Sequence, residues 1–247
     1  MDGYGDFSDE FYINLNLGTE LELPTQRESV LHFFEQVQRR YPQMRNFYSR
    51  DKAEYVLEEA KETGAYRWVS LEPKRVNSGA VNPASVDDVY EQHRTVMDLI
   101  PFILSVSPLD CESMSVTYGF DYAYRGNQGL LLTEALGIAP AFEPMISMPG
   151  VTVLGNEPSI LLALDEECKT QARVNFETRT TAYSVRTGEY AEEQLSVYLT
   201  VRRFDSLLPG ETYVSEFDRL GKISREIVEG YLIENILRPL QSTIAMQ

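Results

Sequence analysis

Residues 114–125 contain the sequence feature that most restricts the fold. Large apolar and aromatic side chains occupy every second position, and smaller or polar residues lie between them. The apolar set is Met114, Val116, Tyr118, Phe120, Tyr122 and Tyr124. Because successive side chains of a strand point to opposite faces of its sheet, this alternation predicts a β-strand with one buried face. Such a strand needs neighbouring strands to pair with and a layer to cover its apolar side.

Further strands are predicted on both sides of this one. Residues 11–17 show the same alternation. The other predicted strands are 54–58, 65–71, 160–165, 171–186 and 194–204. A shift in the apolar phase near Thr180 predicts a bulge within 171–186, and residues 187–189 have the composition of a hairpin tip. The turn-forming residues Asn77-Ser78-Gly79 and Asn82-Pro83 predict a loop.

Three helices are predicted from apolar residues at helical spacing. They should begin after Thr25, Ser85 and Ser215, where a hydroxyl side chain is followed three residues later by a carboxylate. Proline offers no amide and clashes with the preceding turn, so the second helix should kink or end at Pro101 and the third should stop at Pro239.

The order of these elements predicts an α+β protein with a mostly antiparallel sheet and long helices packed on one face. Residues 1–9 are predicted to form a flexible acidic tail, and residues 10–247 a single α+β domain. The halves 10–108 and 109–247 each contain strands and at least one long helix, so we hypothesise that they are structural repeats. The segment 126–159 is rich in Gly, Pro and Met and is predicted to be a long loop, which is often a functional feature.

Composition excludes several classes of function. The chain carries 38 acidic and 22 basic residues and a formal net charge of −16, which is the wrong sign for binding nucleic-acid phosphates. No apolar run approaches the roughly 18 residues that a membrane span needs. The N-terminus lacks the basic and apolar parts of a secretory signal. We therefore expect a cytoplasmic protein that binds neither nucleic acid nor membrane.

The sequence contains no evident catalytic or cofactor motif. Of the two histidines, His93 lies on an apolar helix stripe, where a packed side chain is more common than a base. No nucleophile motif is present, so we assign no catalytic residue and no cofactor. The acidic run Asp165, Glu166 and Glu167 is a weak candidate for binding Mg²⁺ or Ca²⁺, although a solvated turn explains it more simply.

Several residues are candidates for binding a ligand or partner. Arg173 and Arg179 share a face of the predicted strand 171–186, where they could bind an anion or pair with carboxylates on neighbouring strands. Tyrosines, including those at 118–124 and Tyr66 beside Trp68, supply contact area at interfaces, but they can also form a core beneath helices. The candidate binding residues are His93, Tyr122, Tyr124, Arg125, Arg173 and Arg179.

A few short patterns resemble those of a known family. They are Arg39-Arg40-Tyr41-Pro42, Trp68-Val69-Ser70-Leu71 and Val116-Thr117-Tyr118-Gly119-Phe120-Asp121-Tyr122, with a long terminal helix after a strand that ends in an arginine pair. Together they resemble a sporadically distributed, uncharacterised family of bacterial α+β proteins of about this length. The resemblance extends from about Phe11 to Ile236. It implies the α+β architecture and no reaction, cofactor or catalytic residue.

The sequence thus favours a cytosolic binding or protein-interaction module without evident catalytic machinery. Its partner would be another protein or a second copy of the chain. The negative charge suits a basic partner, but the acids are spread over helix caps, turns and solvent faces, so the aromatics and the 126–159 loop support the hypothesis more than the charge does. The alternative is a small-ligand-binding protein or an enzyme with a pocket between the sheet and the 126–159 loop. Its residues would be His93, Tyr122, Arg125 and Asp165. A purely structural scaffold is the third possibility.

Overall fold

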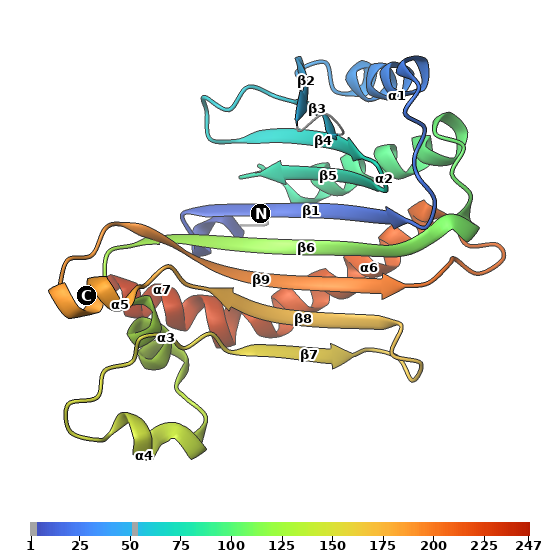
Figure 1. Cartoon of the computed structure of the whole chain (residues 1–247). Helices are drawn as coiled ribbons and strands as arrows, with labels where there is room; N and C mark the ends of the chain where they lie inside the picture. Colours follow the sequence, from blue (N-terminus) through green and yellow to red (C-terminus); the bar gives the residue numbers. More distant parts are fainter. Residues whose placement is uncertain (1–3, 51–53) are drawn as a thin grey trace.

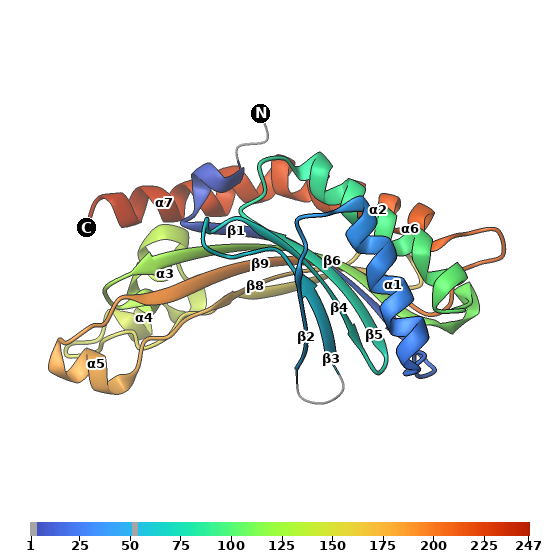
Figure 2. The same cartoon turned by 90° about the horizontal axis from the view of Figure 1, so that it is seen from above.

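The computed structural model describes residues 4–50 and 54–247. Nine strands of the described chain form one antiparallel sheet in the order β2-β3-β4-β5-β1-β6-β9-β8-β7 (Figure 1). The sheet is arched, and the long helices lie on its convex side, so its concave side is left open (Figure 2). The predicted α+β class with helices on one face of an antiparallel sheet is confirmed.

The strands vary from five to fourteen residues. They are β1 (Glu10–Thr19), β2 (Asn46–Arg50), β3 (Glu54–Glu58), β4 (Tyr66–Glu72), β5 (Arg75–Val81), β6 (Cys111–Tyr124), β7 (Ser159–Ala163), β8 (Thr170–Glu177) and β9 (Glu193–Phe204).

The helices lie between or after the strands, and the long ones cover the convex side (Figure 2). They are α1 (Arg27–Arg40), α2 (Val86–Ile103), α3 (Gln128–Leu136), α4 (Glu143–Ile146), α5 (Ala182–Thr187), α6 (Tyr213–Ile227) and α7 (Arg238–Ala245). A π-helical segment, Val228–Leu237, joins α6 to α7. No helix in the described residues combines the length and the apolar character needed to cross a bilayer.

The core lies between the two central strands and the helices. In β1 the side chains of Ile13, Leu15 and Leu17 are fully buried, whereas the residues between them face the open side. The two strands meet in a register that pairs Phe11 with Phe120, whose rings stack with centroids 5.1 Å apart. The predicted alternation of β1 and β6 is therefore the pattern that builds the core.

Residues 75–81 form a strand, so the predicted loop at 77–79 is wrong. Asn77 stays inside the sheet because its amide donates to the Ser70 hydroxyl and to Glu72. The Ser78 hydroxyl accepts a hydrogen bond from the Gln92 amide of α2. Polar side chains can be buried in a strand when they form hydrogen bonds with neighbouring elements, so Asn and Ser here do not mark a turn.

The long strand predicted at 171–186 is also wrong beyond Glu177. Thr181 and Ser184 form a capping box that starts α5, and Gly188 ends it in the left-handed conformation. The phase shift near Thr180 thus records a change from strand to helix and not a bulge, and residues 187–189 are not a hairpin tip.

The helix boundaries differ from those predicted. The N-cap of helix α6 is Thr212, which forms a capping box with Ser215, so Ser215 is the third helical residue and not the cap. Helix α1 has Gln26 at its N-cap and no side-chain cap. The Ser85 cap of α2 is confirmed, and α2 continues past Pro101 to Ile103. The final helix does not stop at Pro239 but continues through the π-helical segment into α7, in which Pro239 is the second residue.

The segment 126–159 is not one loop, because α3 and α4 lie within it. Residues Tyr4–Phe7 form a short 3-10 helix where a flexible tail was predicted over 1–9, and Tyr4 is buried against Phe11 and Tyr118. Residues 1–3 of that tail lie outside the described residues.

The strand order is relevant to the hypothesis of repeated halves. From the centre outward it runs β1-β5-β4-β3-β2 in the first half and β6-β9-β8-β7 in the second, so the first half has one more strand. Each half therefore begins with a central strand and places its later strands outward in reverse order. That the halves superpose stays a prediction.

Candidate functional site

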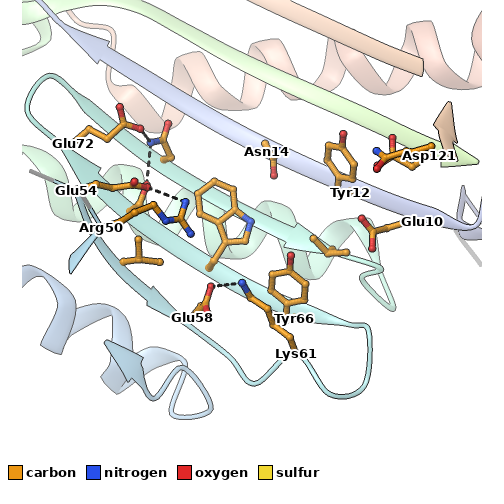
Figure 3. A pocket seen from close by; sticks show the side chains of 16 residues that line it. Glu10, Tyr12, Asn14, Arg50, Glu54, Glu58, Lys61, Tyr66, Glu72 and Asp121 are labelled. Atoms are coloured by element: carbon orange, nitrogen blue, oxygen red, sulfur yellow. Dashed lines mark hydrogen bonds and ion pairs between the residues drawn. The ribbon is translucent and has the colours of Figure 1, made fainter. Parts of the chain in front are cut away.

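The open side of the sheet contains a groove of about 540 Å³, which we call the acidic groove (Figure 3). It crosses the first-half strands and reaches β6 and β9. Its lining residues are Glu10, Tyr12, Asn14, Arg50, Glu54, Val56, Glu58, Lys61, Tyr66, Trp68, Ser70, Glu72, Asn77, Val81, Asp121 and Gln194.

The groove follows from strand alternation. Tyr12 and Asn14 of β1 face the open side because the apolar residues between them face the helices. On β6 the open side receives Gly119 and Asp121, the residues between the buried aromatics. The same alternation that buries one set of side chains thus presents a second, polar set on the concave side.

Two glycines make room for aromatic rings on the floor. A Cβ atom added to Gly79 would lie 2.5 Å from the Trp68 indole, and one added to Gly119 would collide with the Tyr12 ring. Gly79 pairs with Trp68 across β4 and β5, and Gly119 pairs with Tyr12 across β1 and β6. Each ring therefore lies against bare backbone of the neighbouring strand, and the Tyr12 ring also has the Tyr198 ring 6.4 Å away, centroid to centroid.

Carboxylates outnumber cations in the groove. Five acids line it, namely Glu10, Glu54, Glu58, Glu72 and Asp121, against the two cations Arg50 and Lys61. Arg50 lies 3.7 Å from Glu54, and Lys61 lies 2.9 Å from Glu58. In the described part of the chain no lysine, arginine or histidine makes an ion pair with Glu10 or Asp121.

Asp121 is the least compensated of these acids. Its side chain is only 6% exposed, and its Oδ1 atom is buried without a hydrogen-bond partner. Burial raises the pKa of Asp121, although hydrogen bonds from Ser196 and Gln194 and the more distant charge of Arg179 oppose the rise. Burial and the nearby Asp121 charge also raise the pKa of Glu10. The Oδ1 atom of Asn14 is a second buried acceptor without a partner.

The acid-rich surface continues beyond the groove. A neighbouring recess of about 340 Å³ shares Glu10, Asp121 and Gln194 with it. The recess adds three further acids, Asp9, Glu192 and Glu193, and no basic residue. The two hollows together extend over both halves of the sheet, which is more room than a single small cation needs.

Lys61 shows within the molecule what this surface can bind. Its Nζ atom lies 4.9 Å from the centroid of the Tyr66 ring and also pairs with Glu58. Figure 3 shows these three side chains together at one side of the groove, with Glu10, Tyr12 and Asp121 together at another. A cation between an aromatic face and a carboxylate is held by both Coulomb and cation–π attraction. At Tyr12 the same two kinds of group are present without a lysine.

The candidate binding residues predicted from sequence lie on different elements. His93 is fully buried on α2, its Nδ1 atom is 2.9 Å from the Ser78 hydroxyl, and its ring lies against Phe217. Burial lowers the pKa of His93 to about 3, so the ring is neutral at pH 7. Its Nε2 atom has no hydrogen-bond partner.

Tyr122 and Tyr124 lie on the helix-covered side of β6. Tyr122 is 3% exposed, its hydroxyl has no partner, and burial raises its pKa. The Tyr124 hydroxyl donates to Gln247, and Arg125 is exposed just after the strand. The structure places Tyr118 and Tyr122 in the core, and it does not bring them together with His93 and Asp165 in one site.

The two arginines and the acidic run have local partners or face solvent. Arg173 lies on the exposed side of β8, whereas Arg179 comes after the strand and pairs with Glu177 at 3.3 Å. Asp165 accepts hydrogen bonds from the amides of Lys169 and Thr170 in the β7–β8 turn. Glu166 is exposed there, and Glu167 pairs with Lys169 at 2.9 Å. Within the described residues, no cluster of three or more His, Cys, Asp or Glu side chains is arranged to bind a metal ion.

Sequence reasoning noted Tyr66 and Trp68 as possible interface aromatics but did not include them among the candidate binding residues, and it missed the rest of the groove. The signals were Gly79, read as part of a loop, and the pair Gly119 and Asp121, overlooked between the aromatics of β6. On the side of a long strand that carries small residues, a glycine indicates that another group approaches the backbone closely, and an acid indicates a polar surface.

No protein-family model matches the chain, and no curated protein is significantly similar to it in sequence.

Proposed function

We propose that the protein is a binding module that receives a lysine- or arginine-bearing segment of a partner protein in the acidic groove. The observation that carries the proposal is Asp121, a carboxylate that is more than nine-tenths buried on the groove floor, with an unpartnered oxygen and no paired cation. Burying such a charge is unfavourable unless a donor or a cation compensates it. A bound ammonium or guanidinium group supplies both.

The shape and the aromatics support a polypeptide over a free ion. Trp68 and Tyr12 offer ring faces at separate places, and each lies near carboxylates. Two or more basic side chains on one extended segment match such repeated aromatic–acid positions. The excess of acids also repels nucleic-acid phosphates. A cytoplasmic location and membership of the sporadic bacterial family both stay predictions, and no reaction is assigned.

The chain contains a single tryptophan, Trp68, so its fluorescence reports on the groove. The experiment is a titration with short oligo-lysine and oligo-arginine peptides, followed by Trp68 emission and by calorimetry. Saturable binding of the basic peptides is expected, and an oligo-glutamate peptide should not bind. Affinity should increase with pH, because a cationic ligand binds the ionised forms of Glu10 and Asp121, whose pKa values are raised.

Asp121→Asn is the test variant, and Asp98→Asn is its matched control. Both remove one negative charge, but Asp98 is exposed on α2, on the far side of the sheet. We expect Asp121→Asn to lose about tenfold or more in affinity, and Asp98→Asn to bind as the unmodified chain does. Equal affinities for the two variants would show that only the net charge attracts the peptide and would overturn the proposal.

A further inference from the structure

Strand β7 forms an edge of the sheet and lacks the usual protection of an edge. Within the described structure its outer side has no neighbouring strand. Native edges commonly have charges, proline or a bulge that prevents pairing with another chain. Ser159–Ala163 has no charge and no proline, and its register with β8 is unbroken. Ile160, Leu161 and Leu162 are 53%, 61% and 45% exposed.

The backbone of β7 offers hydrogen-bonding groups on this free side. The Leu164 amide donates to the Thr170 carbonyl of β8. Because the ladder bonds of an antiparallel pair alternate along the strand, the amides of Leu162 and Ile160 also point toward β8. Those of Leu161 and Ala163 then point away from the sheet, where another strand can bind them.

The apolar layer of the helix-covered side also continues to this edge without a cover. Ile160 pairs with Val174, and Leu162 pairs with the buried Ala172. The side chains of Ile160 and Leu162 therefore lie on the helix-covered side of the sheet. A groove of about 480 Å³ opens there, with Ile160, Phe176 and Ile236 among its lining residues. The core is thus incomplete at β7.

We propose that this edge binds a second copy of the chain, with the two β7 strands antiparallel about a twofold axis at Leu161. The strand is self-complementary in size. In this register Ser159 lies opposite Ala163, Ile160 lies opposite Leu162, and Leu161 meets its own copy. The outward amides and carbonyls of Leu161 then bond each other across the axis, and the two sheets become one.

The available area suits a stable dimer. Besides the β7 region, the segment around α4 exposes large apolar side chains, and Figure 1 shows α4 beyond the β7 edge of the sheet. The nine side chains concerned are between 38% and 61% exposed: Phe142, Met145, Met148, Val151, Leu154, Ile160, Leu161, Leu162 and Leu164. A stable interface buries about 800 Å² on each partner, and nine half-exposed large side chains offer an area of that order.

The flanking acids are held away from the pairing. In the proposed register Glu157 approaches Asp165 of the second copy. Glu157 accepts hydrogen bonds from the Thr178 amide and hydroxyl at 2.7 and 2.6 Å. Asp165 accepts from the Lys169 and Thr170 amides at 2.9 and 2.6 Å. Both carboxylates are therefore directed into their own chain, and salt screens the remaining repulsion.

The opposite edge does not continue the assembly. Strand β2 ends in Arg50, which is paired with Glu54, and begins with the exposed Asn46. In the proposed register the two β7 strands cover each other's free sides, so this contact closes at two copies.

Sedimentation velocity of the full chain at about 1 to 100 µM tests the proposal. The expected particle has twice the 28.2 kDa mass of one chain. The test variant is Leu161→Lys, and the matched control is Leu208→Lys, because both leucines are 61% exposed. Leu161→Lys should raise the dimer dissociation constant by at least about tenfold, since it places charge in an apolar contact. Leu208→Lys should leave the constant unchanged.

Hydrogen exchange of the unmodified chain gives a second readout that needs no variant. Dilution from dimer to monomer should speed exchange at the amides of Leu161 and Ala163 and leave that of Leu162, which is bonded to β8, unchanged. Three results would overturn the proposal. They are a monomer at the highest concentration, equal dimerisation of the two lysine variants, and particles that grow beyond a dimer. A monomer would mean that the edge serves a different chain.

Discussion

At one end of the sheet, β2 to β5 present carboxylates and aromatic rings on the concave side, and the edge strand carries an arginine. At the other end, β7 presents isoleucine and leucine on both of its faces, with no charge between Ser159 and Ala163. Both ends belong to one antiparallel sheet. β3 and β7 are each three strands away from the central strand of their half, and β2 adds one more strand at the acidic end.

The difference separates two kinds of association in one chain. The acidic end repels another copy and attracts cations, so its binding depends on Coulomb forces and weakens with salt. The apolar end gains by removing surface from water, so its association persists or strengthens in salt. The self-repulsion of a chain with a net charge of −16 is weakest where its charge is locally absent, and β7 is such a place.

The largest effect is expected from filling the groove floor. Gly79→Val should lower the free energy of unfolding by about 2 kcal/mol, because the new side chain overlaps the Trp68 ring and Asn14. It should also shift Trp68 emission to the red. Gly155→Val is the control, since a Cβ at Gly155 meets no atom within 4 Å. Urea unfolding measures both, and equal stabilities would show that Trp68 does not lie against Gly79.

Salt should distinguish most directly between peptide binding at the acidic end and dimerisation at the apolar end. An increase from about 50 to 500 mM NaCl should weaken oligo-lysine binding by about tenfold or more through screening. The same change should leave dimerisation unchanged or strengthen it. Calorimetry and sedimentation in the same buffers give both constants. If both affinities fell together, the β7 contact would be electrostatic and the comparison would fail.

Asp121 should be a residue whose removal stabilises the fold. Its pKa is raised above 3.8 by burial, so the ionised form is disfavoured in the folded state, and this loss of stability grows as pH rises through the raised pKa. Asp121→Asn should therefore raise the free energy of unfolding by on the order of 1 kcal/mol at pH 7, because functional residues often cost stability. The gain should shrink as pH falls, because Asp121 is then neutral in the unmodified chain too. Thermal unfolding at several pH values tests the sign. A less stable variant at pH 7 would make Asp121 a structural acceptor.

The smallest effect is expected on the stability of the monomeric chain when the apolar end is changed. Leu161→Lys should change the unfolding free energy of the dilute, monomeric chain by less than about 0.5 kcal/mol, since the side chain is 61% exposed. Urea unfolding at low protein concentration measures this. A large loss would mean that Leu161 supports its own fold and would weaken its use as a test of dimerisation.

Periodicity was a reliable guide where one side of a strand is apolar. The alternation in β1 and β6 predicted their buried sides correctly, because a period of two has one physical cause. It failed at β5, since Asn77 and Ser78 are polar yet satisfied by Ser70, Glu72 and Gln92. Those partners come from other elements, so no local pattern could reveal them.

The groove was harder to predict than the fold. Its acids come from strands far apart in the chain, and only the strand order brings Glu10 and Asp121 together with Trp68. Turn chemistry misled the prediction in the other direction: the Thr181 capping box and the Gly188 cap form a short helix inside a run of strand-forming residues. Pro101 lies in the last turn of α2, and Pro239 directly follows the π-helical segment, so a helix supported by packing can include proline.

The central position of β1 has a consequence for the order of synthesis. Tyr12 of β1 pairs with Val81 of β5 on one side and with Gly119 of β6 on the other. The hairpins β2 to β5 join consecutive strands and can close locally, whereas both neighbours of β1 are made much later than β1 itself. A nascent chain therefore emerges from the ribosome with its central core strand unpaired on both edges. Its folding must wait for long-range closure, which is slow and exposes the chain to misassembly.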